Sequence, residues 1–362
     1  MKFSTYVIFF LLFGLVPDLF ITFGAGGAPV WIILAWVPTV AALLSLGFIG
    51  LGVRYTDALR VFSYLIFLFE LPKFVGLLFW PLGVAVSLFF AVLIFYSSRH
   101  LKVHEETLSF EQLPQAFDGL RICQLSDIHL GSFGRKAPYV KRVIDATLAL
   151  QPDLILFTGD LVNFASAEAD PYRDELARLK APMGVFAIRG NHDYLLHGHF
   201  KGDEREKDME RLLAFEQSLG WTVLMDQHIL LDKNGQQIAL VGVGNISANP
   251  YFTKMGGNLD KAREGLPKGV FSILLSHDPS HWRSQVVPQG QIPLTLSGHT
   301  HGLKFKLAGH HLSHWRLRES GGLYREGQQV LHVSHGLGSA FAFRLGGFPN
   351  IDLLTLTHTK TD

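Results

Sequence analysis

The stretch RICQLSDIH at residues 121–129 decides how this sequence folds, because a run of apolar residues ends there in a cluster that contains Asp127 and His129. A short apolar run bounded by polar residues is typical of a strand buried on both faces. The same pattern returns further along the chain at 153–158, 185–189, 271–276 and 294–297. Stretches with helical spacing lie between these runs, at 139–150, 174–179 and 203–219. We therefore expect an α/β fold with mixed sheets and with helices outside them.

Shorter apolar runs predict additional strands in the later part of the chain. Asn234-Gly235 lies between the runs 228–231 and 237–243, and this dipeptide favours a tight hairpin turn. Another short run covers 222–224, and the runs 330–334 and 351–357 close the chain as strands.

Each of the five buried strands is followed by residue types that bind metals. The clusters are Asp127-Ile128-His129, Gly159-Asp160, Gly190-Asn191-His192-Asp193, His277-Asp278 and Gly298-His299-Thr300-His301. One such cluster alone is more often a cap or a turn. Five of them at the carboxyl ends of strands, where the loops of an α/β sheet converge, indicate a site. We expect the glycines to allow sharp turns, and residues two apart to leave an extended backbone on one face.

Composition divides the chain into two chemically different parts. The whole sequence of 362 residues has 32 basic and 31 acidic side chains, but residues 1–97 hold only seven of these charges and none of the 17 histidines. The apolar stretches 6–23, 30–53 and 59–96 have the length of membrane helices, and the last would form two helices that turn near 81–83. We predict a transmembrane segment of four helices over 1–97, a polar linker over 98–120 and a catalytic domain over 121–362. A cleaved signal peptide is the alternative for the first stretch.

Basic residues near the ends of the expected spans predict the orientation in the membrane. With four spans, one side of the membrane receives Lys2, Arg54, Arg60, Arg99 and Lys102. By the positive-inside rule the protein would be a multi-pass protein of the cell membrane, with both termini and the catalytic domain on the cytoplasmic side. If 59–96 formed one long kinked helix, the catalytic domain would lie on the opposite side.

The order of the five clusters resembles that of the calcineurin-like metallophosphoesterases, in particular their membrane-anchored bacterial branch. The resemblance spans 121–301 and continues more weakly through Gly321-Gly322-Leu323-Tyr324 and Gly336-Leu337-Gly338. It implies a four-layered αββα sandwich with a binuclear metal centre. Some members of this branch cleave phosphodiesters or lipid-sugar pyrophosphates.

The resemblance also implies a role for each site residue. Asp160 would bridge two metals, the first of which would be held by Asp127, His129 and His301. The second metal would be held by Asn191, His277 and His299. His192 matches the proton donor of the family, with Asp193 as its partner. Imidazole and carboxylate ligands without cysteine suit Mn, Fe, Zn or Mg. The expected reaction is hydrolysis of a phosphodiester, phosphomonoester or pyrophosphate by a metal-bridging hydroxide, with His192 as general acid.

Some residues depart from the family pattern or have no place in it. Leu303-Lys304, His335 and Asn350 replace residues common in this branch, which leaves the substrate open. We interpret His197-Gly198-His199 as a loop over the site. Cys123 is expected in the core, and as the lone cysteine it excludes an internal disulfide.

Several other functions were weighed against the phosphoesterase. A net charge of +1 argues against a nuclease or another nucleic-acid partner. A non-catalytic membrane sensor should have lost metal ligands, and all seven are present. A transporter would need more ionisable groups in the spans than Asp18, Glu70 and Lys73. The apolar loops 249–257 and 339–349, the second of which contains Phe343 and Phe348, have two explanations. They either pack as ordinary core and turns, or they contact an amphiphilic, phosphate-containing substrate reached among membrane lipids.

Overall fold

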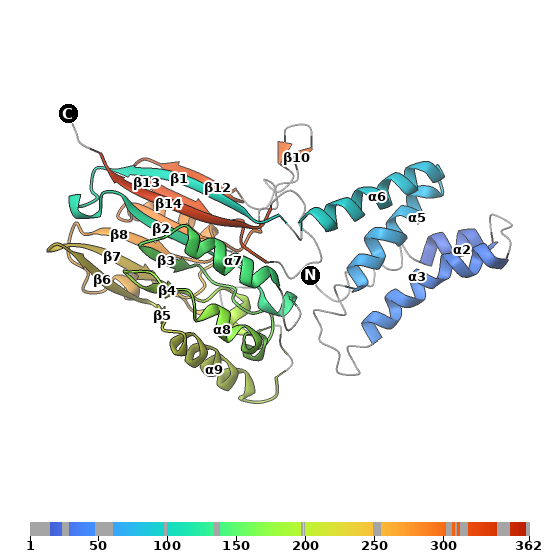
Figure 1. Ribbon diagram of the computed structural model, residues 1–362, viewed down its shortest axis with the longest axis horizontal. Coiled ribbons are helices and arrows are strands. Elements are labelled where there is room, and N and C mark those ends of the chain that lie inside the picture. The colour runs from blue at the N-terminus through green and yellow to red at the C-terminus, as the bar shows by residue number, and fades with distance from the viewer. Residues whose placement is uncertain are drawn as a thin grey trace. The chain divides into compact units, whose positions relative to one another are not determined.

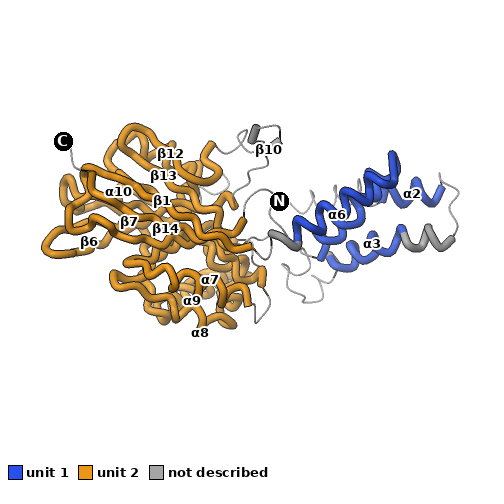
Figure 2. Tube along the Cα trace, turned by 45° about the horizontal axis from the view of Figure 1, so that its top comes forward, with its two compact units in different colours: residues 1–99, 340–344 blue, residues 100–339, 345–362 orange. Residues whose placement is uncertain are grey.

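The computed structural model of the protein (Figure 1) divides the chain into two compact units. One unit comprises residues 1–99 and 340–344, and the other comprises 100–339 and 345–362 (Figure 2). The structure describes residues 15–23, 29–47, 61–97, 100–133, 138–196, 198, 200–248, 255–301, 306–307, 310–311, 318–338 and 348–359.

The first sheet of the larger unit has six strands in the order β1-β14-β2-β3-β4-β5. Strands β2 to β5 run parallel, and β14 runs antiparallel to β2 and parallel to β1. The strands are β1 (Lys102–Phe110), β2 (Leu120–Leu125), β3 (Leu154–Phe157), β4 (Val185–Ala187), β5 (Thr222–Val223) and β14 (Asn350–His358). The range 98–120, interpreted as a polar bridge, thus includes an edge strand, β1, which pairs with the last strand of the chain.

The second sheet also has six strands, in the order β12-β13-β9-β8-β7-β6. The strands β7, β8, β9 and β13 are parallel, and β6 and β12 run antiparallel at the two edges. The strands are β6 (Gln227–Lys233), β7 (Gln236–Gly242), β8 (Phe271–Leu275), β9 (Leu294–Ser297), β12 (Gly322–Glu326) and β13 (Gln329–Val333). A separate hairpin consists of β10 (Lys306–Leu307) and β11 (His310–His311).

Three apolar clusters separate four layers, because successive side chains of a strand point to opposite faces of its sheet. In β3, Leu154 and Leu156 belong to the cluster between the two sheets, which also contains Ile273 of β8. Their neighbours Ile155 and Phe157 pack on the other face. That outer face is covered by α7 (Pro138–Ala149), α8 (Arg173–Leu176) and α9 (Glu204–Ser218) (Figure 1).

The outer face of the second sheet is covered by shorter helices. Ala239 and Val241 of β7 pack with Leu259 of α10 (Leu259–Arg263) and with Trp282 of the π-helix Trp282–Val286. This π-helix continues into α11 (Val287–Gln289). The larger unit is therefore a helix–sheet–sheet–helix sandwich, as expected.

The smaller unit contains helices with mostly apolar sequences. They are α2 (Val16–Phe23), α3 (Pro29–Gly47), the π-helix Ile66–Glu70, α5 (Leu71–Gly76) and α6 (Trp80–Ser97). Within the unit, Lys73 Nζ lies 2.6 Å from Asp18 Oδ1 and 2.7 Å from Glu70 Oε2, so the three charged groups noted in the sequence meet in one cluster. All but two of the exposed large apolar side chains of the described residues lie between residues 16 and 92.

The four membrane-spanning helices expected over 1–97 are not found in the described residues, where no helix has both the length and the apolar character to cross a membrane. The described part of the apolar run 59–96 does break into two segments, but before residues 81–83, where the turn was expected and where α6 has already begun. The break lies at 77–79, just before the helix that begins with Trp80 and Pro81, because proline favours the first turn of a helix.

Candidate metal centre

The seven side chains expected to bind metal lie close together at the carboxyl ends of five strands. The loops that follow β2, β3 and β4 of the first sheet carry Asp127, His129, Asp160 and Asn191. Strands β8 and β9 of the second sheet provide His277, His299 and His301. Parallel strands bring these loops to one edge of the sandwich, and potential ligand atoms of neighbouring side chains approach within 4.8 Å of one another.

One group of ligand atoms surrounds the carboxylate of Asp127. Its Oδ1 lies 4.0 Å from His129 Nε2 and 3.8 Å from His301 Nε2. The backbone N–H of His299 and the hydroxyl of Ser126 donate to the same carboxylate and hold its orientation. Asp160 completes the group, with its Oδ2 at 3.5 Å from His129 Nε2.

The second group of ligand atoms shares Asp160 with the first. Asp160 Oδ2 lies 3.2 Å from His277 Nε2, and Asn191 Oδ1 lies 3.2 Å from the same nitrogen. His299 Nδ1 lies 2.7 Å from Asn191 Oδ1 and 3.3 Å from His277 Nε2. The structure thus brings the expected ligands together as two adjoining groups with one oxygen atom facing both.

Hydrogen bonds behind the imidazoles determine which ring nitrogen faces the site. His277 Nδ1 lies 2.8 Å from the carbonyl oxygen of Thr158, which only accepts, so Nδ1 carries a proton and Nε2 is the nitrogen that faces Asp160. His129 Nδ1 lies 2.6 Å from Asn163 Oδ1 in the same arrangement. Among the described residues, the buried His129 Nε2 has no hydrogen-bond partner. Such an outer hydrogen bond is characteristic of metal-binding histidines.

Asn163 and Asp278 are site residues that the sequence analysis did not assign. Asn163 stands three residues after Asp160, and its amide also donates to Ser132 Oγ. Asp278 Oδ2 lies 3.7 Å from His299 Nε2. Asp278 had a signal in the sequence, because it follows the predicted ligand His277 within one of the five clusters, whereas Asn163 lies outside them.

The backbone at the ligands differs from the extended conformation that the sequence analysis assumed. Asp127, His129, Asp160, His299 and His301 all have positive φ, between 49° and 70°, and they are five of the nine such non-glycine residues in the described chain. This conformation costs about 1–2 kcal/mol per residue and clusters at functional sites. The side chains therefore converge because the loops bend sharply, not because they alternate along a strand.

Residues 159 and 298 require glycine for two different physical reasons. Gly159 has a φ of +96°, as expected for a turn. Gly298 does not have positive φ, but a Cβ there would lie 1.9 Å from Ser126 Oγ and 2.3 Å from Asp127 Oδ2. A side chain at residue 298 would therefore displace the ligand Asp127.

Burial and charge shift the pKa values of the site in opposite directions. Burial lowers the pKa of His129 to about 3. Burial also disfavours a charged His277, but the Asp160 carboxylate outweighs it and raises the pKa of His277 to about 10. For Asp160, burial is outweighed by the nearby histidines, His277 first, and the pKa falls well below its usual value. The space between His277 and Asp160 thus strongly favours a positive charge, which a proton or a metal ion can supply.

His192 and Asp193 lie beside the two ligand groups but in different surroundings. The backbone N–H of His192 donates to Asp160 Oδ1, and its Nδ1 lies 3.0 Å from the carbonyl oxygen of Asn163. The Asp193 carboxylate accepts hydrogen bonds from four backbone N–H groups, those of Asp160, Leu161, Val162 and Gly190. A pairing of Asp193 with His192 remains a prediction, whereas its contact with the Asp160 loop is observed.

Several residues singled out in the sequence lie outside the described residues. These are His197, His199, Leu303, Lys304, Phe343 and most of the loops 249–257 and 339–349. Asn350 is buried at the start of β14 and donates from its amide to Asp352 Oδ1 at 2.6 Å. Cys123 is buried in β2, as expected.

Fold and site together define an α/β protein of two packed sheets with a candidate metal centre at the carboxyl ends of their parallel strands. The residues fit a divalent metal, because imidazole nitrogens and carboxylate oxygens converge from the loops that follow five strands. Comparison with known families narrows this class. A family model described as calcineurin-like phosphoesterase matches residues 120–303, and the chain belongs to this family of metal-dependent phosphoric ester hydrolases.

Individual relatives are similar over part or most of their length. The chain is 29% identical over 205 residues to the transmembrane protein with metallophosphoesterase domain of Danio rerio, covering 55% of this chain and 44% of that relative. It is 29% identical over 280 residues to the uncharacterized metallophosphoesterase YkuE of Bacillus subtilis, covering 73% of this chain and 90% of that relative. The solved structure of phosphopantetheinyl hydrolase from Mycobacterium tuberculosis aligns with a TM-score of 0.38 and 12% identity, over 63% of this chain and 92% of that chain.

Proposed function

We propose that the protein is a two-metal phosphoesterase in which Asp160 bridges two divalent ions, each of them Mn, Fe, Zn or Mg. One observation carries this proposal: a single atom, Asp160 Oδ2, lies 3.5 Å from His129 Nε2 and 3.2 Å from His277 Nε2. Ligand atoms on one ion, each about 2.0–2.2 Å from it, are separated by such distances. Asp127, His129 and His301 would complete one ion's ligands, and Asn191, His277 and His299 those of the other.

The bound ions would lower the pKa of a water molecule and offset the negative charge of a phosphate group. The protein supports this charge balance with only two carboxylates among the seven ligands, those of Asp127 and Asp160. Asn191 is neutral, so the site keeps a positive surplus for the phosphate oxygens. Five of the seven proposed ligands have a left-handed backbone conformation, which would hold their side chains in place before substrate arrives.

His192 is proposed to donate the proton that the leaving oxygen needs. Because the Asn163 carbonyl accepts from Nδ1, Nε2 is the nitrogen left to exchange a proton with substrate. The ring stands edge-on to His129, with ring centroids 4.8 Å apart, and one of its nitrogens lies within 4.8 Å of ligand atoms of His129 and Asp160, so His192 lies directly beside the first ligand group. Asp193 would act on the position of Asp160 through the backbone N–H groups that it binds.

We propose further that the substrate is an amphiphilic phosphodiester, phosphomonoester or pyrophosphate, and that the protein acts at the cell membrane with the catalytic unit on the cytoplasmic side. The support is the concentration of exposed apolar side chains between residues 16 and 92 and the relatives named as transmembrane proteins. The distribution of basic residues over the first 102 positions supports the side.

The test measures hydrolysis of p-nitrophenyl phosphate and bis-p-nitrophenyl phosphate by metal-stripped full-length protein after each of the four metals is returned. We expect activity with at least one metal, and Asp160→Asn should lose nearly all of it together with bound metal. Asp145→Asn changes a surface carboxylate and should leave both unchanged. A folded protein that binds two metals per chain but hydrolyses neither ester would favour the non-catalytic sensor.

The amphiphilic substrate is tested by comparing these soluble esters with a lipid-linked pyrophosphate in micelles. Phe89→Asp places a charge on an exposed apolar side chain of α6. We expect this variant to retain activity toward the soluble esters and to lose most activity toward the micellar substrate. Equal losses, or no loss, would argue against recognition at a lipid surface.

A further inference from the structure

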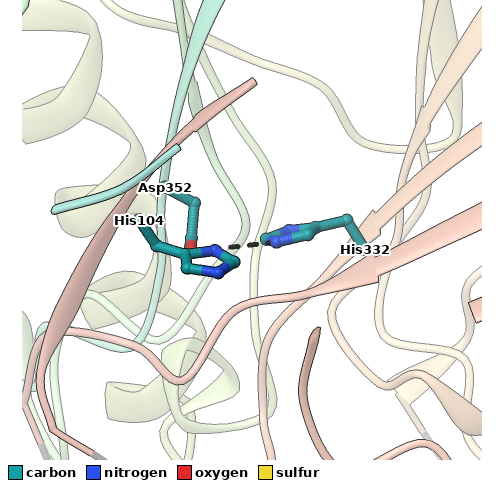
Figure 3. Close-up of side chains that lie close together, drawn as sticks. All are labelled: His104, His332 and Asp352. Carbon is teal, nitrogen blue, oxygen red and sulfur yellow. Dashed lines mark ion pairs between the residues drawn. The ribbon is translucent and has the colours of Figure 1, made fainter. Parts of the chain in front are cut away.

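A second cluster of metal-ligand types, which shares no residue with the candidate metal centre, lies between the two sheets. It consists of His104 on β1, Asp352 on β14 and His332 on β13 (Figure 3). His104 Nδ1 lies 3.6 Å from Asp352 Oδ1, and His332 Nε2 lies 3.7 Å from the same oxygen. The two imidazole rings are stacked, with centroids 6.3 Å apart and an angle of 22° between their planes.

Strand pairing places these residues together. His104 and Asp352 are direct partners in the parallel pair of β1 and β14, so both belong to the first sheet. His332 pairs with Leu296 of β9 and belongs to the second sheet. The cluster therefore joins the two halves of the sandwich through side chains that are 228 and 20 residues apart in sequence, from 104 to 332 and from 332 to 352.

The hydrogen bonds of Gln124 determine which nitrogen of His332 faces the cluster. Gln124 Nε2 donates to the carbonyl oxygen of Ser297 at 2.8 Å, and because a carbonyl only accepts, the amide has one possible orientation. Its Oε1 then accepts from His332 Nδ1 at 2.8 Å. The proton of the neutral ring is thus on Nδ1, and the lone pair of Nε2 points toward the Asp352 carboxylate.

Two buried atoms of the cluster lack partners. In the described part of the chain, neither His332 Nε2 nor Asp352 Oδ2 makes a hydrogen bond. His332 is 1% exposed and Asp352 is fully buried, so bulk water does not solvate them. A lone pair facing a carboxylate in a buried space is unfavourable unless a positive charge lies between them. Asn350 orients the carboxylate by donating to Asp352 Oδ1.

We propose that His104, His332 and Asp352 bind a divalent transition-metal ion of the Zn²⁺ class that ties the two sheets together. Two imidazoles and one carboxylate suit Zn²⁺ better than Mg²⁺, which prefers oxygen ligands. Ligand atoms of a tetrahedral site with bonds of about 2.0–2.1 Å lie about 3.3–3.4 Å apart, so the two nitrogen–oxygen separations of 3.6 Å and 3.7 Å need to shrink by only a few tenths of an ångström. The ligand atoms of the two imidazoles lie within 4.8 Å of each other. Half of the His104 side chain is exposed, which leaves the fourth position to water.

Outer hydrogen bonds support both buried members of the cluster. The Gln124 amide supports the His332 ring and the Asn350 amide supports the carboxylate, as second-layer groups do around structural metals. Because the ion would cross-link β1 and β14 with β13, its main effect is expected on stability. The inference uses none of the residues of the proposed phosphoesterase site and does not depend on that function.

The experiment compares the Zn²⁺ content and thermal unfolding of the full chain with those of His104→Gln, His332→Gln and Asp352→Asn. The protein is stripped with a chelator, loaded with Zn²⁺ and dialysed before metal analysis. We expect each variant to hold about one Zn²⁺ fewer per chain than the original protein and to lose part of the rise in Tm that Zn²⁺ produces. His358→Gln removes another histidine of β14, whose Nδ1 is bound to the Leu113 carbonyl, and should leave the metal content unchanged.

His104→Gln is the decisive variant because a half-exposed residue can be replaced with little risk to folding. Repeating the comparison in an Asp160→Asn background separates the two sites, since the loss caused by His104→Gln should persist when the other ligands are impaired. Replacing Zn²⁺ with Co²⁺ should give an absorption band. In His104→Gln this band should be weaker by the contribution of one bound Co²⁺ ion per chain. Equal metal content and equal Zn²⁺-dependent Tm in His104→Gln and His358→Gln would overturn the proposal.

Discussion

Replacing Asp193 with asparagine should destabilise the protein and empty the metal centre, because Asp193 supports the loop that carries Asp160. In the structure, Asp193 Oδ2 accepts from the backbone N–H groups of Asp160 and Gly190, and Oδ1 accepts from those of Leu161 and Val162. An asparagine amide has one oxygen and one NH₂ group. In either orientation it would point N–H donors at two backbone N–H groups that are buried.

The magnitude of this effect follows from the number of hydrogen bonds lost. Each buried donor left without an acceptor costs about 1–3 kcal/mol, so Asp193→Asn should lower the free energy of unfolding by about 2–6 kcal/mol. The loop would also shift, and a displacement of a catalytic group by about 1 Å reduces turnover about 100-fold. We therefore expect a lower midpoint in urea, less bound metal and weak turnover, all in the same variant.

The assay is urea unfolding at pH 8, with metal analysis and hydrolysis measured on the same samples. Burial and the neighbouring Asp160 charge raise the pKa of Asp193 to about 6, so the carboxylate is ionised at this pH. Asp203→Asn is the matched control, because that side chain is 72% exposed. An Asp193→Asn protein with unchanged stability and full metal content, but slow with poor leaving groups only, would refute this reasoning and would support Asp193 as the partner of His192.

Further variants test the proton donor, the crowding at residue 298 and a buried carboxyl group. His192→Ala should keep its metal and slow hydrolysis of alkyl phosphodiesters about 10²–10⁴-fold, with a much smaller loss for nitrophenyl esters; equal losses would contradict a general acid. Gly298→Ala should lose metal and activity because its Cβ overlaps Ser126, and a fully loaded variant would count against this prediction. Burial raises the pKa of the Glu216 carboxyl group well above 4.5. The folded protein therefore keeps this group protonated at pH values where the unfolded chain ionises it, and the free energy of unfolding falls as pH rises above 4.5. Glu216→Gln should raise the free energy of unfolding by about 1 kcal/mol at pH 8 but not at pH 4, and a less stable variant at pH 8 would contradict this.

Much of the sandwich and of its metal centre could be predicted from local sequence. The runs that begin at residues 121 and 153 form β2 and β3, because apolar stretches bounded by polar residues have few other solutions in a large core. Asn234 and Gly235 form the turn between β6 and β7 with φ of 55° and 76°, as a two-residue hairpin requires. The ligands could be placed near one another because parallel strands end at the same edge.

Other features required the tertiary structure, because they depend on contacts between residues far apart in the chain. The sequence between 98 and 120 is polar and carries no strong strand signal, and β1 forms there because β14 provides its pairing partner. The four backbone N–H groups bound by Asp193 come from loops after two different strands, and nothing in the local sequence indicates them. The family resemblance assigned Asp193 to His192 instead. Sequence patterns indicate local backbone preference and burial, whereas the hydrogen-bond partners of a carboxylate depend on which groups the tertiary fold places within reach.

The second histidine cluster shows the same division most clearly. His104, His332 and Asp352 occupy unrelated stretches without the spacing of a metal motif, and only two strand pairings and the packing of one sheet on the other bring them together. The sequence by itself determined the buried strands, the hairpin and the five ligand loops, since each depends on residues within one short segment. The bent ligand backbones, the support of Asp160 by Asp193 and the cluster between the sheets were decided by tertiary packing, which sets the distances between segments that no local pattern contains.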